Sequence, residues 1–182
     1  MPESETTGLR VMPPRLPSWL SRAVAPLPLA PLQPALALML ARISRAHPDL
    51  YDRLGNHAEK RFGIGPTDLP FAFVLEPRPS RPLARAVRSL PGGLDASIRG
   101  PLAGLIGMAE GTLDGDALFF SRVLWVEGDV AAALALRNAI DDARIDFGKL
   151  LLGGFGPLGV RFADAVRQRI RTLPAAGGTS WS

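Results

Sequence analysis

The sequence predicts an α+β fold in which a mainly antiparallel sheet carries helices on one face. Apolar residues follow a helical period in residues 34–45, 101–111 and 129–142. Between these segments, residues 69–76 and 94–99 show the period of two that is typical of strands. This succession of helices, strands, a helix, a further strand and a helix is the order expected of an α+β domain.

The composition indicates one domain with extensions. The chain has 182 residues, of which 47% are hydrophobic and 21% charged, so it can bury a sizeable core. Its mean hydropathy of +0.14 indicates apolar surface or an apolar cavity. The absence of cysteine excludes disulfides, thiolate nucleophiles and cysteine-ligated metals, and it fits a cytoplasmic location. The net charge of +4 suits anionic lipid headgroups. Nucleic-acid binding is not indicated, because the sequence has no dense basic run interleaved with aromatic residues.

Residues 1–33 are predicted to form a proline-rich extension. Seven prolines lie in this segment, and they disfavour a continuous helix. Residues 23–41 carry no charge, but their longest proline-free part, 35–41, is far shorter than the ~20 residues that span a bilayer. Glu3 and Glu5 argue against a signal peptide. We therefore expect neither a transmembrane span nor secretion.

Residues 34–147 are predicted to form the folded domain, which begins with helices. One helix is expected from Pro34 to about Arg45, and a shorter one from Pro48 to about Lys60. A strand is expected at Leu69–Glu76, and a second one with weaker alternation at Leu83–Ser89.

The second half of this domain contains the strongest strand signal. Leu94–Arg99 alternates cleanly, and residues 101–111 begin with proline and end with glycine, as helices commonly do. After an acidic turn at 113–117, residues 118–127 are apolar on both faces, as in a strand covered on both sides. Asp129 is a good N-cap for a helix that ends near Asp142.

Residues 148–182 are predicted to comprise a glycine-rich hinge and a C-terminal amphipathic helix at 158–171. Residues 154–159 match the letters of the dinucleotide pattern G-x-G-x-x-G, but the strands that must flank such a site are missing, so a hinge is the better interpretation. The sequence favours neither of two positions for the helix, a membrane interface or its own domain. Its apolar stripe is Leu158, Phe162, Val166 and Ile170, and its basic face carries Arg161, Arg167 and Arg171.

The polar residues indicate no catalytic or metal-binding set. Residues 114–116 begin like a calcium loop, but tryptophan stands where that loop needs its final glutamate. Asp129 is explained as an N-cap and Glu127 as a charge at the end of a strand. His47 and His57 have no partners at the spacing of metal ligands. We therefore expect no enzyme, no metal and no cofactor.

The apolar residues around 118–127 allow two interpretations, an ordinary hydrophobic core or a ligand pocket. A core explains most of them. Small residues in the flanking helices favour a pocket, because they leave room, and apolar pockets with few polar anchors bind hydrophobic ligands. These small residues are Ala103, Gly104, Gly107, Ala131, Ala132, Ala133 and Ala135.

One long stretch resembles a known family. Residues 114–142, DGDALFFSRVLWVEGDVAAALALRNAIDD, are similar to UbiT-type proteins, the accessory factors of oxygen-independent ubiquinone biosynthesis. The specific pieces are DALFFSR at 116–122, VEGD at 126–129, LRNAID at 136–141 and, upstream, DASIRGP at 95–101. Val130 is a departure, since the relatives commonly have threonine or a similar polar residue there.

The resemblance implies a sterol-carrier-protein-type domain, in which a five-stranded sheet and helices surround a hydrophobic cavity. It implies that the chain holds an isoprenoid quinone precursor, or a phospholipid, and presents it to enzymes of ubiquinone biosynthesis. Those enzymes include hydroxylases similar to U32 peptidases, which carry iron–sulfur clusters. This chain has no cysteine to ligate such a cluster, which fits an accessory role in the cytoplasm, with or without peripheral contact to the inner membrane.

The residues expected to bind the lipid lie between positions 105 and 137. The apolar candidates are Leu105, Ile106, Phe119, Phe120, Leu124, Trp125, Leu134 and Leu136. Arg122 or Arg137 is expected to meet a polar headgroup. The alternative is a structural adaptor with a filled core, which would scaffold a biosynthetic complex through its amphipathic ends and bind no lipid.

Overall fold

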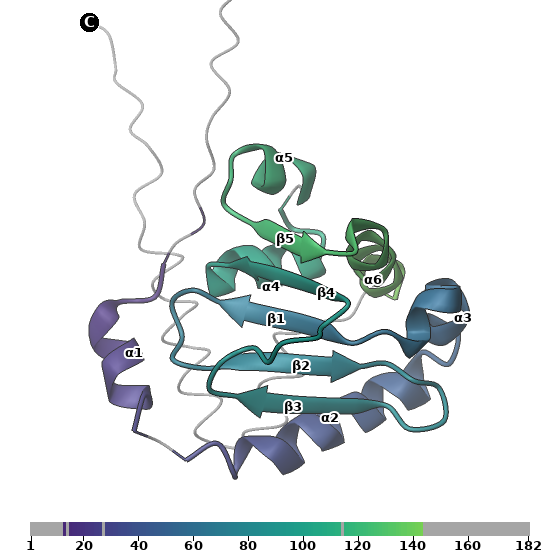
Figure 1. Cartoon of the computed structure of the whole chain (residues 1–182), viewed down its shortest axis with the longest axis horizontal. Coiled ribbons are helices and arrows are strands. Elements are labelled where there is room, and N and C mark those ends of the chain that lie inside the picture. The colour runs from purple at the N-terminus through teal and green to yellow at the C-terminus, as the bar shows by residue number, and fades with distance from the viewer. Residues whose placement is uncertain (1–12, 14, 27, 114, 144–182) are drawn as a thin grey trace, which may run out of the picture.

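A five-stranded mixed sheet forms the centre of the computed structural model, which describes residues 13, 15–26, 28–113 and 115–143 (Figure 1). The strands are β1 (Phe62–Pro66), β2 (Ala72–Glu76), β3 (Leu83–Val87), β4 (Ala96–Gly100) and β5 (Trp125–Gly128). They lie in the order β3-β2-β1-β4-β5. Neighbouring strands are antiparallel except β1 and β4, which are parallel, with Phe62 opposite Ala96.

Helices pack against one face of this sheet, the face that carries Phe62, Ile98 and Val126. They are α2 (Leu32–Ala46), α3 (Leu50–Leu54), the 3-10 helix η1 (Gly55–Glu59), α4 (Leu102–Ala109), α5 (Gly115–Phe120) and α6 (Val130–Asp142), whereas α1 (Ser18–Val24) lies to one side of the sheet (Figure 1). Helix α2 lies along β3, whereas α4 and α6 contact β4 (Figure 1). The sheet and these helices therefore enclose two apolar clusters, a large one under β1 and β4 and a small one between α2 and β3.

The opposite face of the sheet is partly covered by the connection between β3 and β4, which crosses in front of β2 and β1 in Figure 1. Its Leu90 and Leu94 pack directly on two glycines of β1. A Cβ atom at Gly63 would lie 2.6 Å from Leu94 Cδ1, and one at Gly65 would lie 3.4 Å from Leu90 Cδ1. Glycine at these alternate positions therefore lets the connection approach the sheet.

The exposed edge of β3 is satisfied by a side chain of α2. Gln33 Nε2 donates to the carbonyl oxygen of Ala86 at 2.9 Å, and the Ala86 N–H donates to Gln33 Oε1 at 3.3 Å. The Gln33 amide thus makes the two hydrogen bonds that a further strand would make. Such cover protects a sheet edge from pairing with another chain.

The N-terminal segment is tied to the domain through Asp68. Its Oδ2 accepts from the backbone N–H of Leu16 at 3.0 Å, and its Oδ1 accepts from Leu102 at the first turn of α4 at 2.9 Å. Leu102 N–H is one of the helix-terminal donors that lack a partner within the helix. One carboxylate therefore holds both the extension and the start of α4.

Most of the predicted elements are confirmed with shifted ends, and so is the α+β class with its five strands. The predicted helices at 34–45, 101–111 and 129–142 correspond to α2, α4 and α6, and the one at 48–60 comprises α3 and η1. The predicted strands at 69–76, 83–89 and 94–99 correspond to β2, β3 and β4. The Asp129 side chain accepts from Ala132 N–H at 2.9 Å, as expected of an N-cap.

The predicted strand at 118–127 is wrong over most of its length. Residues 115–120 form α5, so the acidic turn predicted at 113–117 is also wrong in part, and β5 contains only four residues. In α5 Leu118 is 3% exposed while Phe120 is 89% exposed, a one-sided burial that a short helix produces. Val123 and Leu124 are buried in the turn that follows, where both N–H groups donate to the carbonyl of Leu118. An apolar run of this length does not separate a helix and a buried turn from a strand.

Two elements were not predicted, β1 and α1. The β1 sequence FGIGP has two glycines and a proline, which are depleted in strands, and α1 lies among the prolines of the N-terminal segment. The predicted hinge and C-terminal helix at 148–182 lie outside the described residues. Among the described helices, none is long and apolar enough to cross a bilayer.

Candidate functional site

The large apolar cluster is the region in which half of the predicted lipid-contact residues meet. Leu105 of α4, Leu124 of the α5–β5 turn and Leu136 of α6 are buried in it, and Phe119 of α5 packs against its margin. The sheet side of this cluster is formed by Phe62, Ala96 and Ile98, and the remaining wall by α3. The structure therefore brings four of the eight candidates together between sheet and helices.

The other four candidates lie apart from this group. Ile106 is half-buried on α4, whereas Phe120, Trp125 and Leu134 are 89%, 45% and 47% exposed. Phe120 and Trp125 were expected inside because residues 118–127 were predicted as a strand covered on both sides. Phe120 instead ends the short helix α5, and Trp125 begins β5 on the side of the sheet that the helices do not cover.

Gly104 and Gly107 of α4 do not leave open space beside the helix. A Cβ at Gly107 would lie 2.5 Å from Leu113 Cδ1, and one at Gly104 would lie 3.2 Å from Pro13 Cγ and 3.6 Å from Leu124 Cδ2. In α6, Ala132 and Ala133 are buried in the large cluster. These residues act by close approach of neighbouring segments, and the interpretation that they leave room is wrong at the two glycines.

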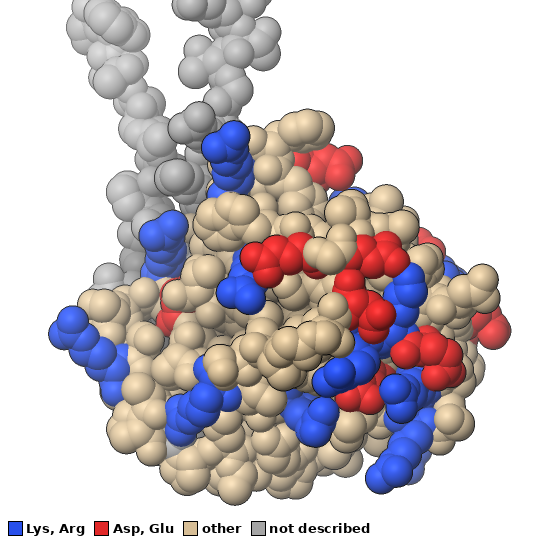
Figure 2. All heavy atoms as spheres, viewed as in Figure 1, with Lys and Arg blue, Asp and Glu red and all other residues tan. Residues whose placement is uncertain are grey.

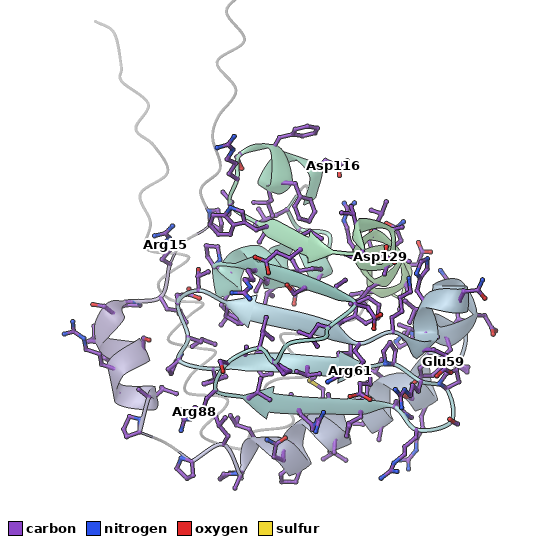
Figure 3. All side chains as sticks on the ribbon, in the orientation of Figure 1. Arg15, Glu59, Arg61, Arg88, Asp116 and Asp129 are labelled. Atoms are coloured by element: carbon purple, nitrogen blue, oxygen red, sulfur yellow. The ribbon has the colours of Figure 1, made fainter. Side chains whose placement is uncertain are left out.

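The two candidate headgroup residues have different surroundings. Arg137 follows Leu136 in α6, is half-buried and has Nη1 3.7 Å from Asp116 Oδ1 of α5 (Figure 3). Its Nε is buried and has no hydrogen-bond partner among the described residues. Arg122 is exposed in the α5–β5 turn. Arg137 is therefore the arginine that places an unsatisfied donor at the margin of the apolar cluster.

Three polar residues that were not predicted to lie together meet at the N-terminus of α6. Lys60 Nζ donates to Asp129 Oδ2, and Asp129 stands at the N-terminus of α6 (Figure 3). The hydrogen bond from Lys60, together with that from the Ala132 backbone N–H, holds the pKa of Asp129 below its ordinary value. Nδ1 of the neighbouring His57 is buried without a partner among the described residues. These contacts join η1 to α6.

The open face of the sheet carries interleaved acidic and basic side chains, as Figure 2 shows. Glu76 Oε atoms lie 3.4–3.7 Å from nitrogens of Arg61, Arg78 and Arg85. Glu127 Oε2 accepts from Ser97 at 3.4 Å and pairs with Arg99. These arrangements are charge-neutralising pairs on a surface. Within the part of the chain that the structure describes, no three histidine or carboxylate residues are placed to bind a metal ion.

Comparison with known proteins gives one family. Residues 40–141 match the family model described as the SCP-2 sterol transfer family. These residues include every strand of the sheet, the second half of α2 from Leu40 onward and nearly all of α6. Among curated protein sequences no match was found.

Solved structures with the same arrangement are distant in sequence. A UbiJ-SCP2 ubiquinone synthesis protein superposes with a TM-score of 0.52 at 18% identity, over 66% of this chain and 98% of that one. A sterol carrier protein 2 from Yarrowia lipolytica gives 0.46 at 15% identity, over 72% and 98%. A sec-alkylsulfatase, Pisa1 from Pseudomonas sp., gives 0.44 at 19% identity, over 50% of this chain and 14% of that one. The first of these similarities supports the fold derived above.

Proposed function

Because the chain belongs to the SCP-2 sterol transfer family, we propose that it is a non-catalytic lipid-binding protein that holds a hydrophobic ligand in its large apolar cluster. The ligand we propose is an isoprenoid quinone precursor or a phospholipid. The chain would present it to enzymes of oxygen-independent ubiquinone biosynthesis, including the hydroxylases similar to U32 peptidases. This role places it in the cytoplasm, in peripheral contact with the inner membrane.

The observation that carries the proposal is the coincidence of the family match with the apolar cluster. Residues 40–141 contain all five strands, α4 and the buried part of α6, which together surround that cluster. A site of this kind, apolar with few polar groups at its rim, binds hydrophobic ligands with a polar end. Arg137 supplies a donor at the rim, since its Nε has no partner among the described residues.

The assignment to ubiquinone biosynthesis has a separate basis. It depends on the resemblance of residues 114–142 to UbiT-type proteins. The UbiJ-SCP2 structure, which is similar in fold at 18% identity, is described as that of a ubiquinone synthesis protein. The lipid-binding proposal does not depend on this pathway.

The proposal is tested by native mass spectrometry of the purified full chain, followed by solvent extraction and identification of the lipid. Leu105→Trp should reduce the bound lipid because it adds volume to the large cluster. Leu40→Trp is the matched control, since Leu40 is 7% exposed in the small cluster where Leu105 is 6% exposed in the large one. Thermal unfolding of both variants would establish that each is folded.

Either of two results would contradict the proposal. One is a clean unliganded mass that does not change when a polyprenylphenol or phosphatidylglycerol is added. The other is an equal loss of lipid in both tryptophan variants, which would show that the large cluster is not the site. A bound quinone precursor or phospholipid that Leu105→Trp removes would support it.

A structural adaptor is the second candidate, and one observation favours it. The space beside Gly104 and Gly107 is filled by Pro13, Leu113 and Leu124, as in a closed core. An adaptor predicts no lipid and a stable complex with a biosynthetic partner. Loss of that complex on deletion of residues 157–182 would support this candidate over the carrier.

A further inference from the structure

Residues 119–125, which comprise the end of α5, the turn that follows and the first residue of β5, present two exposed aromatic side chains. Phe120, the last residue of α5, is 89% exposed, and Trp125, the first residue of β5, is 45% exposed. Arg122 lies between them and is also exposed. Figure 1 shows α5 standing beyond β5, the last strand of the sheet. A folded domain gains nothing for its own core from these aromatic side chains.

The backbone of this turn gives a second observation. Arg122 has φ +56°, and it is the non-glycine residue with positive φ among the described residues. It ends α5 in the position where helices commonly place glycine, with its N–H donating to Phe119 and that of Val123 donating to Leu118, both at 3.0 Å. An arginine costs conformational energy here that a glycine would avoid. The sequence therefore has an arginine side chain here although glycine would adopt this backbone conformation at a lower energy.

The charge of the turn is positive. Among the described residues Arg122 has no ion pair within 4 Å, and Asp116, the acidic residue near the start of α5, pairs with Arg137 of α6. Arg99 stands opposite Trp125 in the β4–β5 ladder, but it pairs with Glu127 at 3.5 Å and so adds no net charge to this surface. Aromatic rings next to arginine are the side chains that anchor proteins at the boundary between headgroups and acyl chains.

We propose that residues 119–125 form a docking surface for an anionic phospholipid bilayer, in which Phe120 and Trp125 enter the interface and Arg122 meets lipid phosphates. The position of α5 beyond the last strand favours this partner over a folded protein, since single rings can enter a bilayer whereas a stable protein interface needs a broad complementary surface. The surface lies outside the large apolar cluster. Docking on a bilayer and binding of a lipid inside the domain can therefore each fail without the other.

Tryptophan fluorescence of the full chain tests the contact directly. In the variant Trp19→Phe/Trp181→Phe, Trp125 is the remaining tryptophan. Its emission should shift to shorter wavelength on vesicles of phosphatidylcholine with phosphatidylglycerol, and less on phosphatidylcholine alone. Added salt should reverse the shift in part, because exposed charges are screened.

Co-sedimentation with the same vesicles identifies the residues. Phe120→Ser should weaken binding about tenfold, whereas Leu38→Ser, at the 45% exposed Leu38 of α2, should leave it unchanged. Arg122→Gln should weaken binding about fivefold, as one arginine at an anionic surface contributes. Arg45→Gln is its control, since it removes the same charge from an exposed position of α2.

Three outcomes would overturn the proposal. The first is no binding to anionic vesicles, and the second is equal effects of Phe120→Ser and Leu38→Ser. The third is binding that survives Phe120→Ser but is lost on deletion of residues 157–182, which would assign the contact to the C-terminal region. If the chain does not bind vesicles, light scattering gives the reason. A dimer that dissociates on Phe120→Ser would assign the surface to a second copy of the chain.

Discussion

Replacing Gly100 tests how closely the α5–β5 connection packs on the end of β4. A Cβ at this position would lie 2.3 Å from Leu124 Cδ2 and 2.8 Å from the carbonyl oxygen of Val123. Rotation of Leu124 relieves the first contact, but the second requires the backbone to move. Gly100→Ala should therefore lower the free energy of unfolding by about 2 kcal/mol, within the range for overpacked sites. For a chain of this length the corresponding fall in Tm is about 4–8 °C.

A double-mutant cycle isolates the contact with Leu124. Leu124→Ala alone should cost about 3 kcal/mol, because Leu124 is 2% exposed and its removal leaves a cavity. In the double variant the new methyl group of residue 100 occupies part of that cavity, so the combined cost should be about 1 kcal/mol less than the sum. Urea unfolding followed by circular dichroism measures all three variants. Gly92→Ala is the control, since a Cβ there meets nothing within 4 Å.

Strictly additive free energies would refute this reasoning, and so would a Gly100→Ala variant as stable as the Gly92→Ala control. Either result would mean that Leu124 does not pack on β4, and the buried turn between α5 and β5 would then be placed incorrectly. The four candidate lipid-contact residues would lose their common cluster with it, because Leu124 is one of them.

Three further predictions follow from single residues. Because the folded-state pKa of Asp129 is lowered, its ionised form stabilises the fold above its ordinary pKa near 3.8, and this contribution is lost as the pH falls through the lowered value. Asp129→Asn keeps an acceptor for Ala132 but loses the pair with Lys60, so its urea midpoint should vary less with pH in acid. Arg122→Gly should raise the free energy of unfolding by about 1 kcal/mol, because glycine accepts positive φ. The same variant should bind vesicles more weakly. A loss of stability would show instead that the arginine side chain supports the fold. Gln33→Ala leaves Ala86 without two hydrogen bonds and should cost about 2 kcal/mol in urea unfolding, whereas Gln33→Glu, which retains an acceptor, should cost less.

The α+β class was predictable from periodicity because most elements are half-buried. Helix α2 buries Leu36, Leu40 and Ile43 at helical spacing, and Asp129 begins α6 with the hydrogen bond that its residue type favours. In these segments the local pattern and the tertiary contacts agree. The pattern therefore located them within a few residues.

Two parts of the fold could not be read from local pattern. The glycines of β1 reflect the approach of Leu90 and Leu94, which are about 30 residues away in the sequence. Among residues 118–124, Leu118, Val123 and Leu124 are apolar because they are buried in a helix and a turn, whereas Phe120 is apolar although it is exposed. Composition alone does not state for which surface an aromatic residue is used. The sequence pattern does not distinguish buried from exposed aromatic residues. For this reason only four of the eight candidate residues lie together in the large cluster.

The parallel pairing of β1 and β4 has a consequence for how the domain reaches its native state. Strands β1, β2 and β3 follow one another as hairpins, whereas the pairing of Phe62 with Ala96 spans the whole of that meander. Contacts so distant in sequence close slowly, because the intervening chain must be ordered first. Until β4 arrives, the inner edge of β1 remains an unpaired strand, the kind of edge on which nascent chains aggregate. Since α4 and α6 reach the sheet through β4, we expect the half that contains the large apolar cluster to be the last part of the domain to fold during synthesis.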